Sequence, residues 1–157
     1  MRTAVDTNVF LDLLAGDSAA IAAARMAIAD ALGLGSLAIC PAVYAELAAN
    51  FPGQDELTRF LQTFHIQVDD FSTDALFQAA VAWRLYVRTR GRESQCPRCG
   101  HRTVLVCPGC GAPLSWRQHI LHDFLVGGHA AVQADRLLTR DPHYYRHYFP
   151  AVAIISP

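Results

Sequence analysis

The sequence predicts an α/β protein of three layers, in which helices cover both faces of a central parallel sheet of about five strands. Short apolar segments alternate with longer helix-forming segments along the 157 residues, a pattern typical of strand–helix–strand units. Although 52% of the residues are hydrophobic, no apolar run reaches the roughly 18 uncharged residues that a membrane span needs. One domain without a membrane segment is therefore expected at this length.

The predicted strands are short apolar runs, and several of them end at a polar or acidic residue. They cover residues 3–6, 37–40, 66–70, 136–139 and 152–155. The first lies in MRTAVDTNVFLDLL, which has an acid inside its apolar stretch and no small-residue cleavage site. This segment favours a strand over a signal peptide, so a cytoplasmic location is expected.

The predicted helices fill the segments between these strands, and several have recognisable starts. Asp17 or Ser18 is the N-cap candidate of an Ala-rich segment. Pro41 opens a later helix, because proline is tolerated in a first turn, and Ser72 or Thr73 is a further cap candidate. The helices expected are 17–32, 41–51, 55–64, 72–90, 116–134 and 141–149.

Four of the five cysteines form two C-x-x-C pairs in the segment between the last two long helices. They are Cys96, Cys99, Cys107 and Cys110. A glycine follows each pair, which suits the tight turns of a metal knuckle, and four thiolates satisfy a tetrahedral, structural Zn²⁺ site. The sequence therefore predicts one domain over 1–157 with a zinc-ribbon insertion at 93–115, a redox dithiol pair being the alternative. The fifth cysteine, Cys40, is expected to be a buried apolar residue.

The basic residues are unevenly distributed. All 13 are arginines, and the segment 84–117 contains seven of them and a single acid, Glu93. These seven are Arg84, Arg88, Arg90, Arg92, Arg98, Arg102 and Arg117. The segment has a formal charge of +6 and the rest of the chain −7. Because guanidinium groups bind phosphates in a bidentate manner, the segment is either a nucleic-acid contact or a solvated helix end.

Four acidic residues are expected to converge at one edge of the sheet. Asp6 ends the first predicted strand, and Glu46 lies in the helix after the second. Asp123 lies in the helix before the fourth strand, and Asp141 follows that strand. Sites in parallel sheets form at the carboxyl ends of strands, where carboxylates repel one another unless a cation joins them. Such hard oxygen ligands suit Mg²⁺ or Mn²⁺, which can orient and activate a water for attack on a phosphodiester.

Three of these acids also have a simple structural explanation. Asp141 precedes a proline and is a good N-cap, whereas Glu46 could lie on the solvated face of its helix. Asp6 could be a turn residue. Asp123, inside the apolar LHDFLV, lacks such an explanation, since a buried carboxylate needs a partner.

Three motifs, in order, resemble the PIN-domain nucleases, and within them the VapC-type toxins of bacterial toxin–antitoxin pairs. The motifs are AVDTNVFLDLL, YAEL and HDFLVGGHAAVQADRLLTRDPHYY, and the likeness covers about residues 2–90 and 116–157. The resemblance implies a PIN-like fold and an Mg²⁺- or Mn²⁺-dependent endoribonuclease acting on RNA. The residues that match the family's acids and their polar neighbours are Asp6, Glu46, Asp123, Asp141, Asn8 and Thr139.

The resemblance also implies partners. Members of this family commonly form homodimers and are inhibited by a small antitoxin protein that covers the acidic crevice. Ordinary members lack a Cys₄ ribbon, so substrate choice and antitoxin docking in this chain can depart from the common pattern.

Other functions fit the sequence less well. The main alternative is a non-catalytic RNA- or protein-binding module that uses the ribbon, and such a module has no need for four acids at these positions. The HD dipeptide at 122–123 is typical of phosphohydrolases that need an all-helical scaffold, and haloacid-dehalogenase phosphatases need an acid where this chain has Asn8. The histidines expected to pack or cap helices are His119, His122 and His129. The segment HYYRHY (143–148) is expected to pack against the sheet, base stacking being the alternative.

Overall fold

A parallel five-stranded sheet forms the centre of the computed structural model, which describes residues 1–89, 93–96, 98–114 and 121–157. The strands follow the order β3-β2-β1-β8-β9 and all neighbouring pairs are parallel. Their bounds are β1 Arg2–Val5, β2 Ser36–Ile39, β3 Ile66–Val68, β8 Arg136–Leu138 and β9 Ala153–Ile155. The α/β class and the five parallel strands predicted from the sequence are confirmed.

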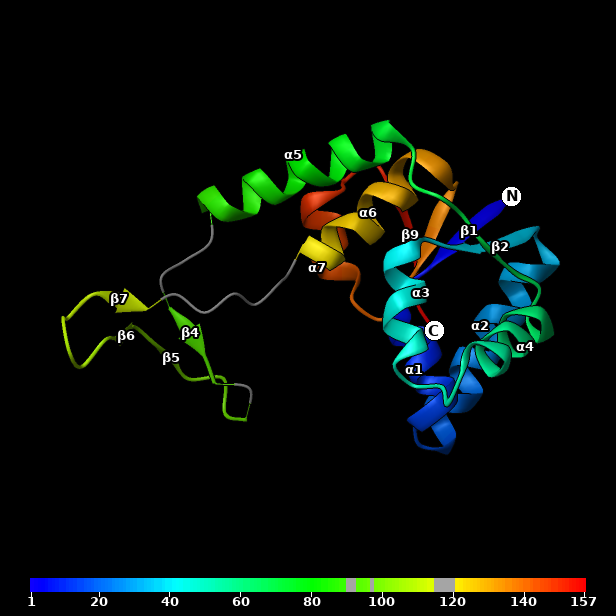
Figure 1. Cartoon of the computed structure of the whole chain (residues 1–157), viewed down its shortest axis with the longest axis horizontal. Helices are drawn as coiled ribbons and strands as arrows, with labels where there is room; N and C mark the ends of the chain where they lie inside the picture. Colours follow the sequence, from blue (N-terminus) through cyan, green and yellow to red (C-terminus); the bar gives the residue numbers. More distant parts are fainter. Residues whose placement is uncertain (90–92, 97, 115–120) are drawn as a thin grey trace.

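Helices flank this sheet (Figure 1). Their bounds are α1 Thr7–Ala15, α2 Ser18–Gly33, α3 Pro41–Ala48, α4 Gln54–Thr63, α5 Thr73–Thr89, α6 Leu121–Gln133 and α7 Pro142–Tyr148. Residues 116–120 of the predicted helix 116–134 lie outside the described part of the chain. Helix α1 is an addition, because the sequence predicted no helix between the first strand and Asp17. It forms because Val9 and Phe10 bury completely against the core.

The expected helix starts are present. The side chain of Asp17 accepts a hydrogen bond from Ala20 N at 2.9 Å, and Ser72 Oγ accepts one from Ala75 N at 3.1 Å. Each bond satisfies one of the backbone donors that a first turn leaves unpaired. Cys40 is fully buried, as expected, just before α3.

The order of the strands determines which face each helix covers. The chain runs from β1 outward to β2 and β3, then returns past β1 to β8 and continues to β9. Right-handed crossovers in opposite directions place their helices on opposite faces. Figure 1 accordingly shows α5, α6 and α7 on one side of the sheet and α2 and α4 on the other.

Helices α5, α6 and α7 are joined by aromatic packing around Phe124, which is fully buried in α6. Its ring centroid lies 5.2 Å from that of Trp83 in α5 and 5.3 Å from that of Tyr148 in α7. The contact between α5 and α6 is close, since a Cβ on Gly128 would stand 2.4 Å from the carbonyl oxygen of Ala75. This packing fixes the first turn of α6 relative to the sheet.

The segment between α5 and α6 contains two small antiparallel hairpins, each made of two-residue strands. The strands are β4 Ser94–Gln95, β5 Arg102–Thr103, β6 Leu105–Val106 and β7 Pro113–Leu114. Figure 1 shows them beyond the end of α5. Among the described residues, no helix is long and apolar enough to cross a membrane.

Candidate acidic active site

The carboxyl ends of β1 and β8 form the base of the candidate site. These strands are neighbours, and their onward connections lead in opposite directions, to β2 and to β9. Such a reversal opens a crevice at the carboxyl edge of a parallel sheet. Asp6 follows β1 directly, and its backbone N–H donates to the carbonyl of Leu138, the last residue of β8, at 3.0 Å.

The Asp6 carboxylate is the common acceptor of a network of side-chain hydrogen bonds. Asp6 is only 8% exposed. Its Oδ2 accepts hydrogen bonds from Asn8 Nδ2 at 2.7 Å and from Thr139 Oγ1 at 2.7 Å. The hydroxyl of Tyr145, in α7, donates to the same oxygen at 3.2 Å. Side chains from both ends of the chain thus hold one carboxylate in a single orientation.

A second layer of hydrogen bonds fixes Thr139 and Asn8. Thr139 Oγ1 accepts from Asn8 Nδ2 at 3.1 Å and from the backbone N–H of Asp141 at 3.0 Å. Asn8 Oδ1 accepts from the backbone N–H of Arg140 at 3.0 Å. The Arg140 guanidinium also pairs with the buried Asp12 of α1 at 2.8 Å. The loop after β8 is therefore bound to the start of α1 at several points.

All four acids predicted from the sequence line one cavity of about 130 Å³ at this edge. The complete lining is Asp6, Thr7, Asn8, Leu11, Glu46, Asp123, Asp141, Tyr144 and Tyr145. Asp123 lies half-buried in the first turn of α6, next to the Phe124 anchor. Asp141 lines the cavity and also caps α7, its Oδ1 accepting from Tyr144 N at 3.3 Å. The cap interpretation is confirmed, and a role of Asp141 in the site stays a prediction.

Glu46 is exposed, as is Asp141, whereas Asp123 is half-buried and Asp6 is buried. Val43 and Leu47 anchor α3 in the core, while the Glu46 side chain, 47% exposed, lies at the rim of the cavity. His122 Nε2 lies 2.9 Å from Glu46 Oε2, and the contact is an ion pair only when the imidazole is protonated. The expectation that His122 only packs or caps a helix is therefore incomplete, because its ring contacts a residue of the site.

The buried position of Asp6 makes its negative charge unfavourable. Burial raises the pKa of Asp6 above its ordinary value, the hydrogen bonds from Thr139 and Tyr145 oppose this, and the charge of Asp123 adds to the rise. Burial also raises the pKa of Tyr145 well above its ordinary value. Tyr145 consequently stays protonated and available as a donor to Asp6.

This arrangement fits a divalent cation in the chemistry of its donors. Carboxylate oxygens surround a polar cavity, and a cation there would offset both the burial of Asp6 and its repulsion by Asp123. The carboxylates are spread around the cavity, however: within the described ranges, no three His, Cys, Asp or Glu side chains lie close enough together to hold a metal ion.

Tyr145 is the member of the network that the sequence did not predict. The residues of HYYRHY were expected to pack against the sheet, and Tyr144 and Tyr145 are indeed buried. Packing leaves open where a hydroxyl points, and the placement of α7 against β9 and α5 brings the Tyr145 hydroxyl to Asp6. The two adjacent tyrosines, two and three residues after Pro142, are the sequence signal that could have suggested a polar role.

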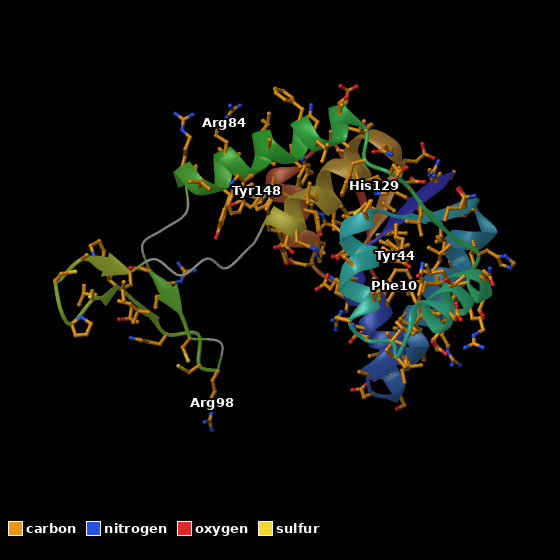
Figure 2. The ribbon with its side chains drawn as sticks, viewed as in Figure 1. Phe10, Tyr44, Arg84, Arg98, His129 and Tyr148 are labelled. Carbon is orange, nitrogen blue, oxygen red and sulfur yellow. The ribbon has the colours of Figure 1, made fainter. Side chains whose placement is uncertain are left out.

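The insertion places its two cysteine pairs in separate turns. Among the described residues of the insertion, no three metal-binding side chains lie close enough together to hold a metal ion, so the zinc site stays a prediction. Arg84, Arg88, Arg98 and Arg102 are exposed, and Figure 2 shows Arg84 and Arg98 pointing outward from α5 and from the hairpin of β4 and β5. The predicted residues Arg90, Arg92, Arg117 and His119 lie outside the described ranges.

His129 behaves as expected for a packing residue. It is 1% exposed in α6, and its Nε2 lies 3.0 Å from Oδ2 of Asp69, which also pairs with Arg2. Figure 2 shows it directed into the molecule. This cluster ties the end of β3 to α6 and lies apart from the acidic cavity, to whose lining none of its members belongs.

Comparison with solved structures shows the same fold elsewhere. The chain is similar to a chain of VapBC2 from Rickettsia felis, bound to a DNA fragment from its promoter, with a TM-score of 0.62 and 15% sequence identity. The match covers 99% of this chain and 98% of that one. No family model and no curated protein sequence matches the chain. The likeness shows that the chain has the PIN-like α/β fold that its motifs predicted.

Proposed function

We propose that the protein is an Mg²⁺- or Mn²⁺-dependent endoribonuclease and the toxin component of a toxin–antitoxin pair. The observation that carries the proposal is the convergence of Asp6, Glu46, Asp123 and Asp141 on one cavity at the carboxyl edge of the sheet. A binding module has no use for carboxylates gathered from four separate elements, of which the most buried is held by three side-chain donors. The fold shared with a chain of VapBC2 supports the same assignment.

The residues of the site have different proposed roles, which depend on whether they would contact the cation or contact Asp6. Asp6, Glu46, Asp123 and Asp141 would hold the cation, and a bound Mg²⁺ or Mn²⁺ supplies Lewis-acid activation of a water and stabilises charge on the phosphate. Asn8 and Thr139 orient the Asp6 carboxylate through their 2.7 Å hydrogen bonds. Tyr145 excludes solvent from the inner side of that carboxylate and donates to it.

The proposed partners are inferred from the distribution of charge in the chain and from the resemblance of its motifs to the VapC-type toxins. An acidic cavity repels RNA phosphates without a cation, so backbone contacts must come from elsewhere, and the exposed Arg84, Arg88, Arg98 and Arg102 offer them. A small antitoxin that covers the cavity and a homodimeric assembly belong to the same proposal, on the strength of the motifs.

Cleavage of a structured RNA pool by the purified protein tests the function. Cutting is expected with Mg²⁺ or Mn²⁺, is expected to stop with EDTA, and is expected to be lost in Asp6→Asn. Asp74→Asn, an exposed acid of α5 outside the cavity lining, is the matched control and should cut normally. If the proteins bind RNA and none of them cuts it, the non-catalytic module is favoured instead.

A further inference from the structure

The two hairpins of the insertion repeat one backbone pattern around their cysteines. In the first, Cys96 N donates to the carbonyl of His101 at 2.8 Å and Gly100 N donates to the carbonyl of Cys96 at 2.9 Å. In the second, Cys107 N donates to Ala112 and Gly111 N to Cys107, both at 2.8 Å. Each bond therefore has its equivalent eleven residues later, at the same place in the other C-x-x-C turn.

The glycine after each pair completes the match. Gly100 has φ 73° and Gly111 has φ 71°, a left-handed conformation that glycine adopts without strain. These values turn the chain back over the cysteines, so that the second sulfur of each pair lies beside the first. Backbone N–H groups of the turn and the partner thiol contact the sulfur of Cys96 in the first turn and that of Cys107 in the second.

The hairpins have no core of their own. Every described residue from 98 to 114 is exposed except Cys107, and the exposed residues include Val104, Leu105, Val106 and Leu114, each 40% or more accessible. Two-residue strands with exposed apolar side chains do not bury enough surface to be stable alone. Something must therefore bring the two hairpins together, and the chain offers four sulfurs for that purpose.

We propose that Cys96, Cys99, Cys107 and Cys110 form a single tetrathiolate Zn²⁺ site that joins the two hairpins. Each turn is already shaped as half of the site, and bending the chain at Val104, between β5 and β6, would bring the halves together. Closure would also cover the apolar residues next to that bend. Four thiolates around Zn²⁺ carry a net charge of −2, which Arg98 and Arg102 partly offset.

The site is structural, because four protein ligands leave no coordination position for a water or substrate. Its formation links metal binding to the folding of the insertion, since the sulfurs of both pairs meet only in the metal-bound state. The inference does not depend on the nuclease proposal, as the acidic cavity contains none of these cysteines.

The experiment is a cobalt(II) titration of the reduced full-length protein, followed by displacement with Zn²⁺. The proposal predicts one equivalent of cobalt per chain, the absorption of a tetrahedral thiolate complex, and loss of that signal in Cys99→Ser and in Cys110→Ser. Cys40→Ser, at the buried cysteine before α3, is the matched control and should keep the full signal.

Alkylation of the wild-type protein gives a second readout that needs no substitution. All four insertion thiols should become protected together when one equivalent of Zn²⁺ is present. Independent protection of each pair, two metals per chain, absence of binding, or two intra-pair disulfides in protein purified without reductant would each overturn the proposal.

Discussion

Replacement of Thr139 by valine removes the hydroxyl that organises the acidic site and preserves the shape of the side chain. Thr139 is fully buried, and its Oγ1 donates to Asp6 Oδ2 at 2.7 Å while it accepts from Asn8 Nδ2 at 3.1 Å and from Asp141 N at 3.0 Å. Valine can take part in none of these bonds. The substitution therefore isolates the contribution of the network from that of packing.

The cost can be worked out bond by bond. A buried polar group that loses its partner costs about 1–3 kcal/mol of stability, and more when it is charged. Asp6 keeps its bonds from Asn8 and Tyr145, and Asn8 keeps its bond to Asp6. The penalty falls mainly on the Asp6 carboxylate and the Asp141 N–H, which gives a loss of about 2–4 kcal/mol for Thr139→Val.

The assay is urea unfolding of the metal-free protein at two pH values. The loss should be larger at the higher pH, because the Thr139 hydrogen bond stabilises the ionised form of Asp6. Thr139→Ser keeps the hydroxyl and should recover most of the difference. Thr63→Val, whose hydroxyl bonds only to the carbonyl of Arg59 within α4, is a surface control expected to change stability by less than about 0.5 kcal/mol. A Thr139→Val protein as stable as the wild type at both pH values would refute the network.

Three further predictions concern the site and the arginines. Burial raises the folded-state pKa of Asp6, so protonated Asp6 contributes stability at acidic pH, and this contribution is lost as the pH rises through that pKa. Asp6→Asn should therefore raise the urea midpoint of the metal-free protein at neutral pH and not at acidic pH. Tyr145→Phe removes a donor to Asp6 and should weaken Mn²⁺ binding by about tenfold or more in a titration, with RNA binding unchanged. The double variant Arg98→Gln, Arg102→Gln should weaken RNA binding and flatten its salt dependence, whereas Arg25→Gln on α2 should not; equal affinity and slope in the double variant would exclude these arginines from the RNA contact.

The sequence predicted the sheet well because each buried parallel strand corresponds to a recognisable local sequence pattern. Each is a short apolar run flanked by helix starts, and the N-cap at Asp17 has the bond expected of it. Helix α1 was missed because the run NVFLDLL follows a strand without a break, and a short apolar run does not separate strand from helix. The partner of its buried Asp12 is Arg140, a residue at the other end of the chain.

The members of the candidate site and their convergence at one edge of the sheet were predicted from the sequence, whereas their individual contacts were not. Motifs and strand ends identified the four acids with Asn8 and Thr139, and the structure brings all of them to one place. The Tyr145 hydroxyl and the Glu46–His122 contact depend on how α7 and α6 pack against the sheet, which no local pattern records. The cysteine turns were predicted from spacing and glycines alone, and their local geometry is as expected.

The most direct test of the acidic metal site is a titration of Mn²⁺ into the RNA-free protein, followed by electron paramagnetic resonance of the free ion. Saturable binding is expected that is lost in Asp6→Asn and in Asp123→Asn and kept in Asp74→Asn. Absence of binding in the wild type, or equal binding in all four proteins, would show that the acids lining the cavity do not hold a cation.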